Sequence, residues 1–167
     1  MSVSIVIMGV AGCGKSSVGQ QVAARLGLPL IEGDDFHSDE SRAKMREGTA
    51  LTDADRHGWL LALAAQLQAH PQGVVLSCSA LKRAYRDLLR AASPGLRFVY
   101  LHIDIEAAQA RVAARAAHFF SASLVQSQFA ALEDPRGEPL VLRLSATSPV
   151  SDLCQAVSAW LNPEEHS

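Results

Sequence analysis

Short apolar runs alternate along the chain with longer stretches in which apolar residues recur at helical spacing. The short runs predict strands at residues 3–8, 30–31, 73–77, 97–103 and 140–144. The longer stretches predict a first helix that ends at Leu26 and further helices at residues 53–69, 82–92, 105–117, 123–132 and 150–161. Strands that alternate with helices in this way predict an α/β fold of three layers, in which helices cover both faces of a five-stranded parallel sheet.

Length and composition narrow the class of protein. A chain of 167 residues fits one domain, residues 1–167, and can bury about 70% of its unfolded surface without a disulfide or metal. The net charge of −2 argues against a nucleic-acid or acidic-membrane partner. Three cysteines without C-x-x-C spacing indicate no disulfide framework, and residues 1–9 are too short for a signal peptide or a membrane span. We therefore expect a soluble, cytoplasmic protein.

The first glycine-rich segment carries the strongest chemical signal. Residues 9–16 match G-x-x-x-x-G-K-[ST] directly after a predicted strand and at the start of a helix, the context that a phosphate-binding loop requires. Lys15 would reach the β- and γ-phosphates of ATP, and the Ser16 hydroxyl would bind Mg²⁺. A glycine-rich turn without a ligand is the alternative. The predicted nucleotide-binding residues here are Gly9, Gly12, Cys13, Gly14, Lys15, Ser16 and Ser17.

Carboxylates follow the second predicted strand, in the string EGDDFH at residues 32–37. The carboxyl ends of parallel strands face the ligand crevice in open α/β sheets. Phosphoryl transfer needs a carboxylate that takes the proton of the acceptor hydroxyl, and Asp34 is the candidate for this role. Glu32 or Asp35 would hold Mg²⁺ through water. A solvated acidic turn is the alternative, and His37 by itself is more often structural than catalytic.

Arg56 opens the next helix beside Asp53 and Asp55. It would either clamp an anionic substrate through two hydrogen bonds or form a surface ion pair with these acids. Trp59, at helical spacing behind it, is predicted to belong to the core.

Further cations follow the third predicted strand. Lys82 and Arg86 are spaced i, i+4, so we expect both at the mouth of the crevice, facing phosphate or carboxylate. Arg83 and Arg90 are expected to point to solvent. Residues 78–90 hold four basic residues and one acidic residue, whereas residues 31–55 hold eight acidic and three basic residues. This division predicts a crevice with an acidic, metal-binding side and a basic, anion-binding side.

A second pair of arginines, Arg111 and Arg115, is again spaced i, i+4 and precedes His118. Charges in this place suit a mobile lid, at about residues 115–125, that closes over the triphosphate and excludes water. An exposed basic helix end that complements the helix dipole is the alternative.

Taken together, these motifs resemble the gluconate kinases, a family of small P-loop kinases. The segments GVAGCGKS, EGDDFH, KMREGTALTDADRHGWL, CSALKRAYRDLLR and RVAARAAHFFSASLVQSQFAALEDP carry the resemblance over most of residues 5–135. It implies a P-loop nucleoside-kinase-like fold, ATP:D-gluconate 6-phosphotransferase activity with magnesium, and a homodimer. The residues that it assigns to acceptor binding are Asp34, His37, Arg56, Lys82, Arg86, His118 and Gln128, and those that it assigns to the lid include Arg111 and Arg115.

The chain departs from the usual pattern of this family at Ser38, Ser41, Ala50 and Ala117, none of which removes a charged group. A related kinase of another hydroxy acid, such as a shikimate-type kinase, remains the main alternative. A nucleotide-binding regulator without transfer activity is a second alternative, which the set of acceptor and lid residues disfavours.

Overall fold

The computed structural model describes residues 2–114 and 122–162. Five parallel strands form one sheet in the order β2-β3-β1-β4-β5, which confirms the predicted fold class. The strands are β1 (Ile5–Met8), β2 (Leu30–Glu32), β3 (Val75–Ser77), β4 (Arg97–His102) and β5 (Val141–Ser145). Each lies within about two residues of its predicted bounds.

The central strand β1 shows why both faces of the sheet are covered. All four of its residues are fully buried, and successive side chains point to opposite faces. Ile5 and Ile7 belong to one apolar cluster, whereas Val6 and Met8 belong to the other. A strand of this kind is stable only between two layers of helices.

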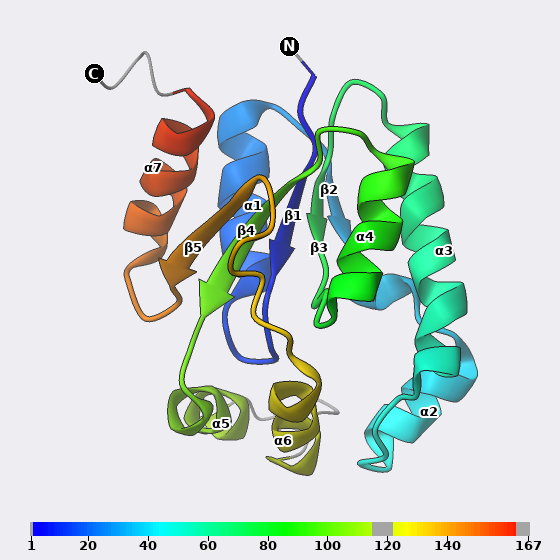
Figure 1. Cartoon of the computed structure of the whole chain (residues 1–167). Helices are drawn as coiled ribbons and strands as arrows, with labels where there is room; N and C mark the ends of the chain where they lie inside the picture. Colours follow the sequence, from blue (N-terminus) through cyan, green and yellow to red (C-terminus); the bar gives the residue numbers. More distant parts are fainter. Residues whose placement is uncertain (1, 115–121, 163–167) are drawn as a thin grey trace.

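Two pairs of helices supply these layers (Figure 1). Helices α1 (Lys15–Leu26) and α7 (Val150–Leu161) cover one face, and α3 (Asp53–Ala69) and α4 (Arg83–Ala92) cover the other. Near the carboxyl ends of the strands lie α2 (Asp39–Arg46), α5 (Ile105–Ala114), α6 (Ala122–Ala131) and a short 3₁₀ helix, η1 (Gly33–Phe36). No helix within the described ranges is long and apolar enough to cross a membrane.

Helix α2 has no counterpart in the prediction. Its N-cap is Ser38, whose hydroxyl accepts a hydrogen bond from the backbone N–H of Ser41. Only Ser41 and Met45 in it are buried, so the helix lacks the apolar stripe on which the prediction depended. The cap and the acidic residues that follow it were the signal that could have located it.

Candidate active site

The phosphate-binding loop joins β1 to α1 at the carboxyl edge of the sheet. Gly14 caps α1 with a φ of 93°, in the left-handed region that glycine adopts without strain. The Lys15 ammonium donates to the backbone carbonyls of Gly9, at 3.0 Å, and Val10, at 3.2 Å. Cys13, within the loop, is buried. The lysine therefore already lies over the loop whose N–H groups open α1.

Ser16 and Glu32 bring two oxygen atoms together beside this loop. The Ser16 hydroxyl donates to Glu32 Oε2 at 3.0 Å, although the residues are 16 positions apart. A hydroxyl and a carboxylate oxygen suit Mg²⁺, which takes one or two carboxylates and completes its shell with water and phosphate. The donor set therefore fits a magnesium ion. Asp35 is exposed, and no contact between it and Ser16 is found in the described part of the chain, so Glu32, which accepts from the Ser16 hydroxyl, is the better placed of the two predicted carboxylates.

The turn after β2 presents Asp34 and His37. Gly33 makes the turn possible, because a Cβ atom there would lie 2.5 Å from the Ser77 carbonyl oxygen of β3. The Trp59 indole N–H donates to the Gly33 carbonyl oxygen at 2.7 Å, and the Trp59 ring stacks on His37 with 4.4 Å between ring centroids. Trp59 is in the core, as predicted, but it also forms the wall behind His37.

His37 carries a buried polar atom without a partner. Its side chain is 6% exposed, Nε2 lies 3.8 Å from Asp34 Oδ1, and no hydrogen-bond partner of Nδ1 is found among the described residues. Burial lowers the pKa of His37, although the nearby Asp34 partly opposes the shift. The imidazole is therefore neutral near pH 7, with one ring nitrogen left for a ligand.

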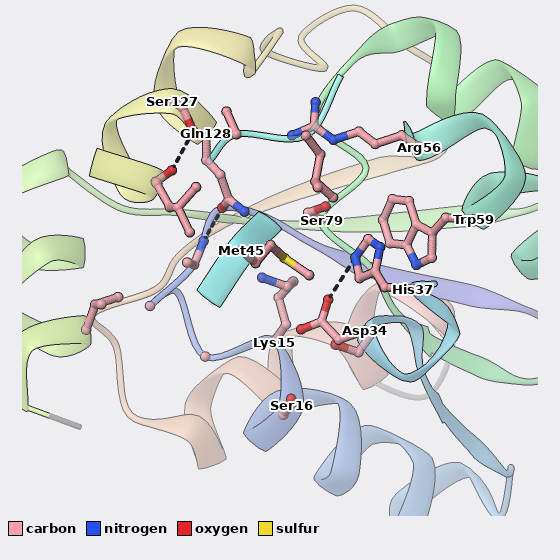
Figure 2. Close-up of a pocket in the computed structure, with 18 of the residues that line it drawn as sticks. Lys15, Ser16, Asp34, His37, Met45, Arg56, Trp59, Ser79, Ser127 and Gln128 are labelled. Carbon is pink, nitrogen blue, oxygen red and sulfur yellow. Dashed lines mark hydrogen bonds and ion pairs between the residues drawn. The ribbon is translucent and has the colours of Figure 1, made fainter. Parts of the chain in front are cut away.

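A cavity of about 160 Å³ connects the loop to this turn, as Figure 2 shows. Asp34, His37 and Trp59 form one wall, Lys15 lies at the loop, and Arg56 projects from α3. Ser127 and Gln128 of α6 close it from above, and Leu124 of the same helix also lines it. Further lining residues that the sequence did not single out are Met45, Leu51, Ser77, Ser79 and Val112. These were missed because each is apolar or small and is brought to the cavity only by folding.

Gln128 and Arg111 both contact the phosphate-binding loop. Gln128 Oε1 accepts a hydrogen bond from the Ala11 backbone N–H at 2.6 Å, across 117 positions of sequence. Arg111 donates to the carbonyl oxygens of Gly12, at 3.1 Å, and Ala146, at 3.0 Å. The structure thus brings both predicted residues to the loop. Arg115 and His118, predicted for the lid, lie outside the described residues.

Lys82 does not line the cavity. Its ammonium pairs with Asp53 Oδ1 at 2.9 Å, and the Tyr85 hydroxyl donates to the same carboxylate oxygen. Tyr85 was not predicted as a site residue. The Arg56 guanidinium, by contrast, is in the cavity wall and pairs with neither Asp53 nor Asp55. Asp55 pairs instead with Lys44, at 2.8 Å.

The predicted position of Arg86 at the crevice mouth is wrong. Its side chain is fully buried and paired with Glu138, with 2.7 Å between Nη2 and Oε2. Arg90 also turns inward and forms an ion pair with Glu138, with 2.8 Å between Nη2 and Oε1, whereas Arg83 is exposed, as expected. Glu138 lies 52 residues beyond Arg86, so local spacing could not reveal the pair.

Burial also determines the protonation state of Cys78, which directly follows β3. Loss of hydration raises the pKa of its thiol to about 12, so the thiol stays protonated at neutral pH. It is not an activated nucleophile.

This chain is similar to known proteins both in sequence and in fold. The sequence model of the shikimate kinase family matches residues 11–134. The thermosensitive gluconokinase of Escherichia coli is 41% identical over 138 residues, which cover 81% of this chain and 74% of that protein. The gluconokinase of Gluconobacter oxydans is 42% identical over 145 residues, which cover 84% of this chain and 81% of that protein.

Solved structures agree with these sequence matches. The crystal structure of a gluconokinase from Sinorhizobium meliloti has a TM-score of 0.88 and 45% identity, with 98% of this chain and 95% of that chain covered. A shikimate kinase from Acinetobacter baumannii, solved with shikimate, has a TM-score of 0.67 at 14% identity, with 100% and 97% covered. The similarity to the shikimate kinase structure is a similarity of fold alone.

Proposed function

Because this chain belongs to the gluconokinase family, within the wider shikimate-kinase-like group, we propose that it transfers the γ-phosphoryl group of ATP to the 6-hydroxyl of D-gluconate. The products are ADP and 6-phospho-D-gluconate. One observation carries the proposal: a single cavity runs from the phosphate-binding loop, with Lys15, to a wall that bears Asp34, His37 and Arg56.

Each end of the cavity suits one part of the reaction. The loop N–H groups and the Lys15 ammonium would bind the β- and γ-phosphates. Asp34 would accept the proton of the acceptor hydroxyl as its oxygen bonds to the γ-phosphorus. The bond from that phosphorus to the β,γ-bridging oxygen breaks, and its electron pair leaves with ADP.

Ser16 and Glu32 would hold magnesium, since their oxygen atoms lie 3.0 Å apart beside the loop. When bound, the metal would neutralise charge on the phosphates. Arg111, and Arg115 from the lid, would add positive charge around the triphosphate.

The acceptor would lie between Asp34 and Arg56. A sugar acid has hydroxyls along its chain and a carboxylate at the end opposite the 6-hydroxyl. The unpartnered His37 Nδ1 suits one of these hydroxyls, because a buried polar atom gains most from a hydrogen bond. The Arg56 guanidinium suits the carboxylate. Of the three cations predicted to face gluconate, Arg56 alone lines the described cavity, since Lys82 and Arg86 are paired with Asp53 and Glu138.

Release of ADP, measured with a coupling enzyme, tests the proposal. The purified protein is offered ATP and magnesium with gluconate, shikimate, other sugar acids or nucleoside monophosphates. Turnover that depends on gluconate supports the proposal. Turnover with shikimate alone would favour the shikimate-type alternative, and no turnover with any acceptor would contradict kinase activity.

Family membership also supports a cytoplasmic homodimer. Light scattering behind a sizing column tests the oligomeric state, and a mass of one chain, 17.8 kDa, would contradict the dimer.

A further inference from the structure

Arg56 is held in the cavity wall by a neutral group. No carboxylate among the described residues lies within 4.0 Å of its guanidinium. Its Nη1 instead donates to the Tyr85 hydroxyl at 3.3 Å, and the guanidinium carbon lies 5.8 Å from the centroid of the Tyr85 ring. A second cation, the Lys82 ammonium, lies 5.8 Å from the same centroid.

The direction of each hydrogen bond in this cluster is fixed by chemistry. An arginine has no acceptor, so the Tyr85 hydroxyl must accept from Arg56. Its single hydrogen is then free for Asp53, which also accepts from Lys82 at 2.9 Å. Hydrogen bonds from Tyr85 and Lys82 hold the pKa of Asp53 below its usual range, so this group is a carboxylate at neutral pH.

The chain Arg56–Tyr85–Asp53–Lys82 therefore separates the positive charge of Arg56 from the negative charge of Asp53. Lys82 neutralises Asp53, and the uncharged tyrosine lies between that ion pair and Arg56. A direct pair with Asp53 would fix Arg56 equally well, but it would neutralise the charge that an anionic acceptor needs.

We propose that Tyr85 is a positioning residue for the acceptor: its hydroxyl fixes Arg56 in the cavity wall and keeps it apart from Asp53, so that the guanidinium is left for the carboxylate of the sugar acid. Lys82 contributes by forming an ion pair with Asp53, rather than by contacting the substrate. This inference rests on the proposed function, because it takes gluconate as the acceptor.

Tyr85→Phe tests the first part, since it removes the hydroxyl and keeps the buried ring. We expect the KM for gluconate to rise about tenfold, as for the loss of one hydrogen bond to a charged group, while kcat and the KM for ATP stay within about twofold. Tyr100→Phe is the matched control, because Tyr100 is also buried but its hydroxyl lies near His102 and outside the cavity. An unchanged KM for gluconate in Tyr85→Phe, or an equal rise in the control or for ATP, overturns the inference.

Lys82→Met tests the second part, because it leaves Asp53 without its cation and free to attract Arg56. The KM for gluconate should rise, and adding Asp53→Asn to Lys82→Met should bring it back to within about twofold of the wild-type value. Failure of this rescue would show that Lys82 acts in another way. Absence of gluconate turnover in the wild-type protein contradicts the proposed function, whereas wild-type turnover together with normal Tyr85→Phe kinetics contradicts only this inference.

Discussion

The guanidinium of Arg86 and the carboxylate of Glu138 form a two-point ion pair that is closed off from solvent. Nε lies 2.9 Å from Oε1 and Nη2 lies 2.7 Å from Oε2, and the two side chains are 0% and 3% exposed. The other N–H groups of Arg86 donate to the carbonyl oxygens of Ala80, Leu81 and Glu133. The pair thus ties the β3–α4 connection, which carries Ser79 to the cavity, to the segment that follows α6.

Loss of Glu138 should destabilise the fold strongly. Glu138→Ala leaves the Arg86 charge buried and unpaired, which costs about 3–5 kcal/mol in the free energy of unfolding. Urea unfolding measures this loss of unfolding free energy. Arg83→Ala is the control, because the Arg83–Asp87 pair on the same helix is exposed and should contribute less than about 1 kcal/mol. Equal losses for the two variants would contradict a structural role for the buried pair.

Acid should weaken the fold through Asp55 at the start of α3. The Lys44 ammonium, and then the Thr52 backbone N–H, hold the pKa of Asp55 down to about 2, below its ordinary value of 3.8. A lowered pKa in the folded protein stabilises it fully above the unfolded value, and this contribution is lost as the pH falls from about 4 to 2. The difference in unfolding free energy between the wild type and Asp55→Asn should therefore shrink over that interval. A difference that stays constant from pH 5 to 2 would refute the assignment.

Asp34→Asn should reduce turnover and leave nucleotide binding intact. The amide cannot take the acceptor proton, so kcat should fall by about 10²- to 10⁴-fold. Calorimetric titration should show an almost unchanged Kd for ATP. Asp35→Asn changes a carboxylate one residue away that does not line the cavity, and it should keep nearly full activity. Comparable losses in both variants would argue against Asp34 as the base.

Gln128→Ala removes the side chain through which α6 bonds the Ala11 N–H. Loss of one net hydrogen bond changes a binding constant roughly two- to tenfold. Because α6 closes the cavity, we expect the KM for gluconate to rise by this factor. Gln126→Ala changes an exposed residue of the same helix and should leave KM unaltered. If Gln126→Ala raises KM as much, weakening of the helix rather than the contact would be the cause.

The charge pattern of the sequence was only partly informative about the cavity. Four basic residues in 78–90 predicted an anion-binding side, yet Lys82 pairs with Asp53, Arg86 and Arg90 pair with Glu138, and Arg83 is exposed. The acidic partners of Lys82 and Arg86 come from α3 and from the segment before β5, so no local count of charges could detect these two pairs. Arg56, which does line the cavity, had a surface ion pair as an even alternative in the sequence.

Local chemistry by itself determined the α/β alternation, the phosphate-binding loop and the carboxylates after β2, because apolar periodicity and a glycine-rich loop act over a few neighbouring residues. Only the tertiary structure decided which side chains share the cavity. It joined Ser16 to Glu32, stacked His37 on Trp59, and turned Arg86 into the interior. These outcomes depend on which elements pack together and on the need to pair every buried charge, and both are settled between residues far apart in the chain.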